Sequence, residues 1–335
     1  MTCQRLYTFA AFCVLVGLMM SSSGQAQSNL NIRRAARLRS QPTAKLDTLN
    51  SPATSYAYTL FDFPGSLSTF AAGTVVSGKS SKIEVVGCYN AVDAETSFLM
   101  HYTAGKKATA ESYQKIVVPG SANDDCANGV NKDGTIVGLY VDASGIYHGW
   151  QLTGATFSTI NVPFQGAVDT VPNAINDSGE IVGNWDGGNT TGAGFTLING
   201  TYTSILYPGT SFTDVWTVNS KGDLGGDYYD ANNVLHGMTD IAGVFSTLDP
   251  PGSIYTFIQG LDDHDNAVGW FCTTTECEHY GNPGEQGFLY SGGNFTIFNY
   301  PGAVATYLLG INNAGVLLGI YTDAAGNDHG FLATP

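Results

Sequence analysis

Six short apolar runs divide the chain into repeats. Each run contains a glycine that stands two positions before an aromatic residue, and five of the runs follow a turn that begins with Asn or Asp. Turn residues between the apolar runs separate four short β-runs in each repeat. The glycines, which are 43 to 51 residues apart, are Gly87, Gly138, Gly183, Gly226, Gly269 and Gly319. The turns begin at Asn131, Asn176, Asn219, Asp262 and Asn312, and the repeats end at Pro64, Pro119, Pro163, Pro208, Pro251 and Pro301.

This period predicts an all-β fold, a six-bladed β-propeller of four-stranded blades. The last repeat has only three β-runs before the sequence ends, whereas residues 56–63 form an isolated run ahead of Pro64. We expect this N-terminal strand to close the last blade, because closure removes exposed sheet edges. An open β-solenoid is the alternative, although it would not need the isolated N-terminal run.

The N-terminal region predicts an exported protein. Arg5, the apolar residues 6–20 and the small residues Gly24 and Ala26 have the pattern of a signal peptide covering residues 1–26. An uncleaved membrane anchor is the alternative. We expect residues 27–55 to be a disordered basic leader and residues 56–335 to be the propeller. The expected location is extracellular, periplasmic or at the cell surface, with no transmembrane segment in the mature chain.

Charge and cysteine content narrow the partners. The whole chain has a formal net charge of −15. Six of its 13 Arg and Lys residues lie in the predicted signal and leader, so the region after Ser55 is more acidic than the whole chain. An acidic body repels phosphate backbones, so we expect no nucleic-acid partner. Export permits disulfides. We predict the pairs Cys272–Cys277 and Cys88–Cys126, and the cysteine spacing does not indicate zinc.

Two segments carry a family resemblance. Residues 310–331 and, more loosely, residues 129–150 contain a Gly-x-Asn turn, a Gly-x-Tyr-x-Asp step and a closing His-Gly-aromatic step. This pattern resembles the bacterial extracellular repeats called the HAF family, and the resemblance extends over residues 56–335. It implies an exported repeat protein, and it supplies no catalytic residues.

Strand alternation sorts the loops onto two faces of the ring. The proline corners and the loops between second and third strands share one face, here called the corner face, and the Asn/Asp turns occupy the opposite turn face. Ligand-binding candidates on the corner face are Asp124, Asp125, Asp169 and Asp214. The long loop of the fifth repeat adds Glu276, Glu278 and His279, which could bind a ligand or act as an acid/base pair.

Asp125 is also a candidate for Ca²⁺, because it replaces the Thr found at the same place in the other five repeats. Carboxylate and hydroxyl oxygens suit a hard cation. The alternative is a solvated loop in which these residues cap turns, and no other cofactor is expected. The recurring His148, His236 and His329 are expected to make structural hydrogen bonds, and the recurring aromatic residues to pack between blades.

Three classes of function follow. The first is an exported binding module for a glycan or an extracellular protein, using the acidic, aromatic corner face. The second is a secreted hydrolase or lyase with its site at the channel mouth, an alternative that rests on fold analogy alone. The third is a structural cell-surface protein without a small-molecule ligand. The catalytic motifs of serine hydrolases, zinc proteases and nucleotide-binding proteins are absent from the sequence.

Overall fold

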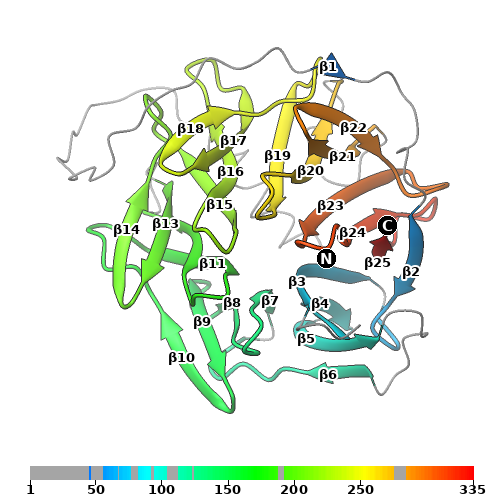
Figure 1. Ribbon diagram of the computed structural model, residues 1–335. Helices are drawn as coiled ribbons and strands as arrows, with labels where there is room; N and C mark the ends of the chain where they lie inside the picture. Colours follow the sequence, from blue (N-terminus) through cyan, green and yellow to red (C-terminus); the bar gives the residue numbers. More distant parts are fainter. Residues whose placement is uncertain are drawn as a thin grey trace.

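The computed structural model is a ring of six antiparallel β-sheets (Figure 1). It describes residues 45–46, 56–66, 68–76, 82–91, 94–103, 112–122, 124–187, 192–274 and 284–335. Five of the sheets have four strands and one has five, and no α-helix occurs within these ranges. The six-bladed propeller predicted from the repeat spacing is confirmed.

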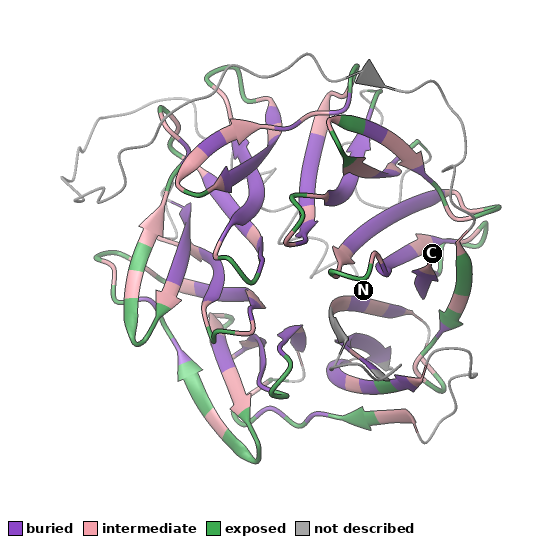
Figure 2. Cartoon of the chain, viewed as in Figure 1, coloured by how far each residue is buried: buried purple, intermediate pink, exposed green. Residues whose placement is uncertain are grey.

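Within each blade the strands follow one another from the axis of the ring outwards. Figure 2 shows that the inner strands are mostly buried and that exposed residues concentrate on the outer strands. Blade 1 contains β3 (Thr69–Val76), β4 (Lys82–Ala91), β5 (Ala94–Thr103) and β6 (Tyr113–Lys115). Blade 2 contains β7 (Asp125–Val130), β8 (Ile136–Val141), β9 (Tyr147–Thr153) and β10 (Thr156–Ile160). Blade 3 contains β11 (Asp169–Ile175), β12 (Ile181–Asp186), β13 (Gly192–Ile198) and β14 (Thr201–Ile205).

The second half of the ring repeats this order. Blade 4 contains β15 (Thr213–Val218), β16 (Leu224–Tyr229), β17 (Leu235–Ile241) and β18 (Val244–Thr247). Blade 5 contains β19 (Tyr255–Leu261), β20 (Ala267–Cys272), β21 (Gln286–Ser291) and β22 (Asn294–Phe298). Blade 6 contains β23 (Ala305–Ile311), β24 (Leu317–Thr322), β25 (Asp328–Thr334) and, as its outermost strand, β2 (Ala57–Phe61).

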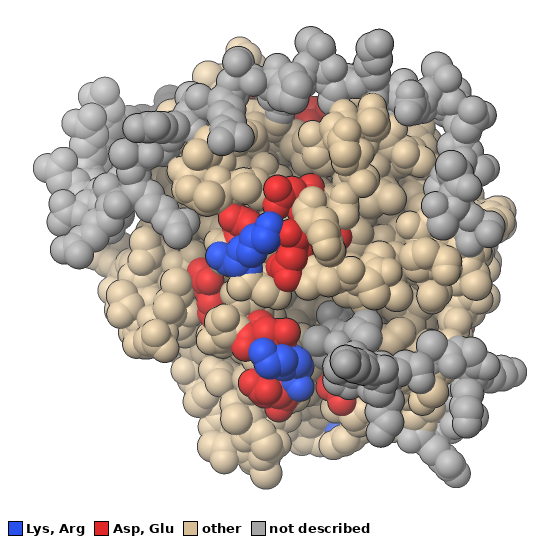
Figure 3. Space-filling model, in the orientation of Figure 1, with Lys and Arg blue, Asp and Glu red and all other residues tan. Residues whose placement is uncertain are grey.

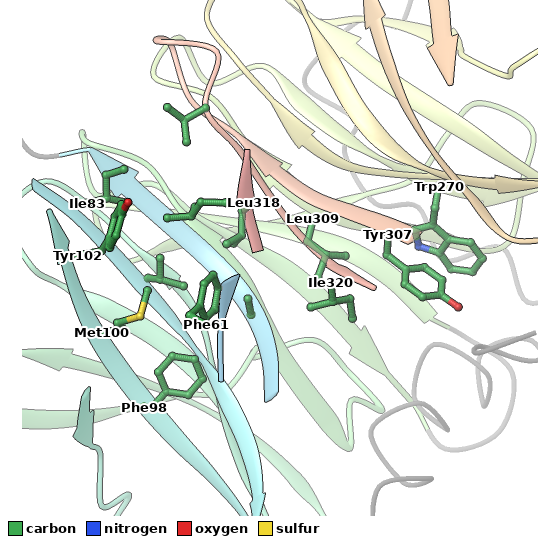
Figure 4. Close-up of a cluster of buried hydrophobic side chains, with 14 of the residues drawn as sticks. Phe61, Ile83, Phe98, Met100, Tyr102, Trp270, Tyr307, Leu309, Leu318 and Ile320 are labelled. Carbon is green, nitrogen blue, oxygen red and sulfur yellow. The ribbon is translucent and has the colours of Figure 1, made fainter. Parts of the chain in front are cut away.

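Strand β2 closes the ring, as the isolated N-terminal run predicts. It pairs antiparallel with β25, from Ala57 opposite Thr334 to Phe61 opposite Gly330. The Phe61 side chain is 3% exposed and belongs to a hydrophobic cluster that joins residues of blades 1, 4, 5 and 6 (Figure 4). Gly330 leaves room for it, because a Cβ there would overlap the Phe61 ring. Strands β2 and β25 thus share one sheet, and Phe61 of β2 packs into the core of the ring.

The repeated glycine on the second strand of each blade has a steric cause. The first strand is irregular opposite it, as between Ala71 and Gly73 in blade 1. At the same level a Cβ on Gly87 would collide with the backbone carbonyl oxygen of Phe70. Equivalent collisions with first-strand backbone would occur at Gly138, Gly183, Gly226, Gly269 and Gly319. A side chain is therefore excluded where the two inner strands approach most closely.

The recurring aromatic residues that follow these glycines pack against the corners between blades. The Tyr228 ring stacks on Tyr207 with centroids 3.7 Å apart, and the Tyr89 ring stacks on Phe63 at 3.6 Å. Aromatic contacts of this kind add to the burial of apolar surface. These aromatic side chains join successive blades, which is the packing role expected from their recurrence.

The Cys88–Cys126 disulfide is confirmed, with a Cα–Cα distance of 4.8 Å, and it joins β4 of blade 1 to β7 of blade 2. Cys272 also takes part in a disulfide. Its predicted partner Cys277 lies outside the described residues, so that pairing stays a prediction.

The predicted signal peptide and most of the predicted leader lie outside the described residues. Within the leader, Lys45–Leu46 forms the short strand β1, which pairs in parallel with β22 and gives blade 5 a fifth strand. Among the described residues, no helix is long and apolar enough to cross a membrane.

Candidate functional site

Five hairpin turns of blades 2 to 6 meet at the centre of the turn face. Each begins with an Asn or Asp whose Oδ1 atom accepts hydrogen bonds from two backbone N–H groups of its own turn. In blade 4, Asn219 accepts from Lys221 and Asp223, both at 2.9 Å. Side chains of this kind replace the backbone partners that a tight turn leaves unpaired. The predicted Asx turns are therefore present.

The same turn residues also tie neighbouring blades together. The side-chain amide of Asn131 donates to the backbone carbonyl of Asn176 at 3.3 Å, and Asn176 donates in the same way to Asn219 at 3.0 Å. Asn219 then donates to the carbonyl of Asp262 at 3.1 Å. The series stops at Asp262, because an ionised carboxylate has no proton to donate. Its Oδ2 atom instead accepts from the Asn266 amide at 2.8 Å.

A second set of contacts uses the next residue of each turn. The backbone N–H of Lys132 donates to Asp177 Oδ1 at 2.9 Å, and that of Ser220 donates to Asp263 Oδ1 at 2.9 Å. The N–H of Asp263 donates to Asn313 Oδ1 at 2.8 Å. These bonds fix the direction of the Asp177 and Asp263 carboxylates around the axis of the ring.

The turns surround a pocket of about 390 Å³ at the mouth of the central channel. Its wall is made by the last residue of the innermost strand in five blades, and its rim by the turn residues. The wall consists of Val130, Ile175, Val218, Leu261 and Ile311. The rim consists of Asn176, Asp177, Asn219, Ser220, Asp262, Asp263, Asn312, Asn313 and Ala314. Among the described lining residues there are three aspartates and no basic side chain.

Two lysines lie at the edge of this rim. Lys132 Nζ lies 3.8 Å from Asp177 Oδ2, and Lys221 Nζ lies 3.4 Å from Asp265 Oδ1. Figure 3 shows basic side chains flanked by acidic ones around the centre of the ring. Acidic groups nevertheless prevail among the described residues of the five turns, which hold Lys132 and Lys221 but also Asp133, Asp177, Glu180, Asp223, Asp262, Asp263 and Asp265.

The candidates predicted on the corner face do not gather in this pocket. Asp125 is 5% exposed and joins blades 1 and 2: it accepts hydrogen bonds from the Ser97 N–H at 2.9 Å, the Ser97 hydroxyl at 2.5 Å and the Ser121 hydroxyl at 2.8 Å. Asp169 accepts from the Tyr147 N–H at 2.9 Å. Burial raises the pKa of Asp169. Both side chains are already held by groups of the protein.

The threonines equivalent to Asp125 have a similar structural role. In four of the five, the hydroxyl accepts a hydrogen bond from the backbone of the preceding corner, as Thr213 does from the Tyr207 N–H at 2.9 Å and Thr306 from the Tyr300 N–H at 2.9 Å. The Thr256 hydroxyl donates to the Ser253 hydroxyl at 3.1 Å. In the described part of the chain, no group of three or more His, Cys, Asp and Glu side chains is placed to hold a metal ion.

Two clusters of buried carboxyl groups lie between blades. Asp214 on β15 lies opposite Asp227 on β16 in the register of the two strands. The Trp216 indole N–H donates to Asp227 Oδ2 at 2.6 Å. Burial, followed by the charge of Asp186, raises the pKa of Asp214 to about 8. Burial, followed by the charge of Asp214, also raises the pKa of Asp227.

In the second cluster, the half-buried Asp124 lies beside Glu95 through an isolated β-bridge. Burial and the charges of Asp124 and Asp125 raise the pKa of Glu95 well above its usual range. Sequence reasoning missed Glu95 and Asp227. The one available signal was a charged residue inside an otherwise apolar or aromatic β-run.

The recurring histidines make the structural contacts expected of them. His236 lies between two carboxylates, with Nδ1 2.7 Å from Asp249 and Nε2 3.6 Å from Asp230. His329 lies in the same way between Asp62 at 3.1 Å and Asp323 at 3.3 Å. The fixed spacing between aspartate and histidine in the sequence pattern reflects this contact. Glu276, Glu278 and His279 lie outside the described residues, so their predicted role stays untested.

No protein-family model matches the sequence, and no curated protein matches it. Solved structures resemble it in fold. TolB from Acinetobacter baumannii is 10% identical, with a TM-score of 0.44 over 79% of this chain, which spans 55% of the length of that structure. The fucose-specific lectin from Aleuria aurantia is 9% identical, with a TM-score of 0.47 over 79% of this chain and 92% of the lectin. The β-propeller domain of the trilobed protease from Pyrococcus furiosus is 8% identical, with a TM-score of 0.46 over 80% and 94%. These likenesses concern the fold alone.

Proposed function

We propose that the chain is an exported ligand-binding propeller and that its ligand enters the pocket at the centre of the turn face. The observation that carries this proposal is the pocket itself, which brings together residues of five blades in about 390 Å³. A concave site with an apolar wall and a few directed polar groups is the usual form of a binding site. Export is supported by the signal-peptide pattern of residues 1–26.

The corner face, which the sequence favoured, offers less for a ligand. Asp125 and Asp214 are 5% and 4% exposed, and the recurring aromatic rings stack between blades. A glycan or an extracellular protein remains the expected partner class, and the binding position moves to the turn face. There the wall residues and the Asp177 and Asp263 carboxylates face one space.

The test is to find a ligand by screening glycan and peptide arrays, and then to fill the pocket. Ile311→Trp adds bulk to the wall at a partly exposed position. Val168→Trp, at a residue 47% exposed beside the corner that leads into blade 3, is the matched control. We expect Ile311→Trp to weaken binding about ten-fold or more and the control to leave it unchanged. Equal binding by both variants would place the ligand elsewhere.

A further inference from the structure

The rim of the pocket carries negative charge that the surrounding structure holds in place. Asp177 and Asp263 are partly exposed, and each uses one oxygen to accept the backbone N–H of the preceding blade. Asp263 uses its second oxygen to accept the Asn313 amide at 2.6 Å. Because the carboxylates are fixed before a ligand arrives, binding does not have to order them.

The wall beneath this rim has no charge. Five aliphatic side chains, one from each of blades 2 to 6, form it. A ligand that fills both parts needs an aliphatic stem and a positively charged end. Anions are disfavoured by Asp177, Asp262 and Asp263, and a purely apolar ligand would bury polar groups of the rim without partners.

The form of the rim distinguishes between kinds of cation. A guanidinium group binds best to both oxygens of one carboxylate. At Asp263 both oxygens are already engaged, and at Asp177 one is engaged and the other lies near Lys132. A compact ammonium group accepts partners from several directions, so it can use the remaining lone pairs of carboxylates that come from different blades.

From this geometry, and resting on the proposed function, we infer that the pocket binds an alkylammonium group, with the aliphatic stem against the wall and the ammonium at the Asp177–Asp263 side of the rim. Two sources share this chemistry, a free aliphatic amine and the lysine side chain of a peptide. The pocket accepts one stem, and the sources differ in what remains outside the mouth.

Isothermal titration of the full chain tests the inference with four probes. 1,5-Diaminopentane and 1,5-pentanediol form one pair, and a Gly/Ser peptide with a single lysine and the same peptide with that lysine acetylated form the other. We expect the charged member of at least one pair to bind about ten-fold or more tightly than its neutral partner. That affinity should fall as salt rises. Tighter binding of the diamine or of the peptide identifies the source.

Three variants locate the charge effect. Asp177→Asn and Asp263→Asn keep an oxygen that can accept the neighbouring N–H and remove the charge, so each should weaken binding about three-fold or more. Lys132→Gln removes a competing cation and should strengthen binding about two-fold or more. In an unfolding assay we do not expect the two aspartate variants to lose stability and Lys132→Gln to gain it. An effect on binding is thereby distinguished from an effect on the stability of the fold.

The outcomes separate the inference from the proposed function. If neutral ligands bind as tightly as charged ones and Ile311→Trp blocks them, the alkylammonium inference is overturned and the pocket remains a binding site. If an amine binds but neither the aspartate variants nor Ile311→Trp affect it, both proposals are overturned. If neither amine probe binds, the inference is likewise overturned.

Discussion

Asp214 on β15 lies directly opposite Asp227 on β16, and the two residues are 4% and 1% exposed. Two buried carboxyl groups side by side cannot both ionise without a large cost. Burial and the charge of Asp186 raise the pKa of Asp214 to about 8, and burial and the charge of Asp214 raise the pKa of Asp227, an effect that the Trp216 indole N–H opposes. The pair therefore keeps a proton at neutral pH.

This pair should make the fold less stable in alkaline solution. In the unfolded chain Asp214 titrates near 3.8, and in the folded chain near 8. The folded state binds more protons between these values, so this contribution to stability is complete below about pH 4, falls as pH rises and is lost above about pH 8. We expect Asp214→Asn to raise the thermal midpoint at pH 9 by about 5 °C and to change it little at pH 4. Asp177→Asn is the control, and an equal gain from it would contradict the assignment.

The contacts of His236 with Asp230 and Asp249 in blade 4 should affect the stability of the fold at a lower pH. The hydrogen bond to Asp249 raises the pKa of His236, with burial opposing it and Asp230 adding to it. Its stabilising contribution is fully present below the unfolded pKa of 6.5 and is lost as pH rises through the higher folded value. His236→Gln should cost about 2 kcal/mol at pH 5.5 and much less at pH 9.

Chemical denaturation at the two pH values measures this difference. His264→Gln is the matched control, because the His264 side chain is 66% exposed and lies 3.6 Å from Asp262. We expect it to change stability by less than about 0.5 kcal/mol at either pH. A pH-independent loss in His236→Gln would show that packing, rather than charge, explains the contact.

Ring closure can be tested at two adjacent residues of β2. Phe61 is 3% exposed within the cluster that joins blades 1, 4, 5 and 6, whereas Leu60 is 45% exposed. Phe61→Ala should destabilise the fold by about 3–5 kcal/mol, and Leu60→Ala should change it by less than about 1 kcal/mol. Equilibrium unfolding in urea measures both. Similar losses from the two variants would mean that β2 does not pack as described.

The disulfide between blades 1 and 2 should stabilise the ring. Cys88 and Cys126 are 38 residues apart, and a cross-link of that span restricts the unfolded chain. Replacing both residues by Ala should lower stability by about 2–4 kcal/mol. Because Cys272 is also disulfide-bonded, the double variant must be compared with the unreplaced chain under reducing conditions. If reduction destabilises the two proteins equally, the effect arises from another disulfide.

The repeat spacing predicted the ring because the second strand of every blade needs a glycine where it approaches the backbone of the first strand. This requirement makes the glycine recur in the sequence once per blade. The pocket could not be found in this way. It arises where five turns converge, and no single repeat contains it. The bond from Asn131 to Asn176 likewise depends on the distance between blades, whereas its Asx turn depends only on local sequence.

The corner-face prediction shows a second limit. The charge of Asp125 and Asp214 is visible in the sequence, whereas the exposure of their side chains depends on residues of other strands and of the corner between blades. Ser97 and Ser121 enclose Asp125, and Asp227 adjoins Asp214. Ser97 and Asp227 lie on other strands, and Ser121 lies in the connection that precedes β7, so these contacts become visible only when the sheets are assembled.

The pairing of Ala57 with Thr334 also has a consequence for synthesis. Strand β2 is the first strand of the propeller to be translated within blade 6, and β25, its partner in the sheet, is the last. Contacts of such long sequence separation form slowly, because the whole intervening chain must first be brought into place. During translation β2 is therefore made long before β25, the strand with which it pairs. The ring closes only after β25 has been made, and a chain that lacks β25 leaves β2 and β24 of blade 6 without the strand that joins them.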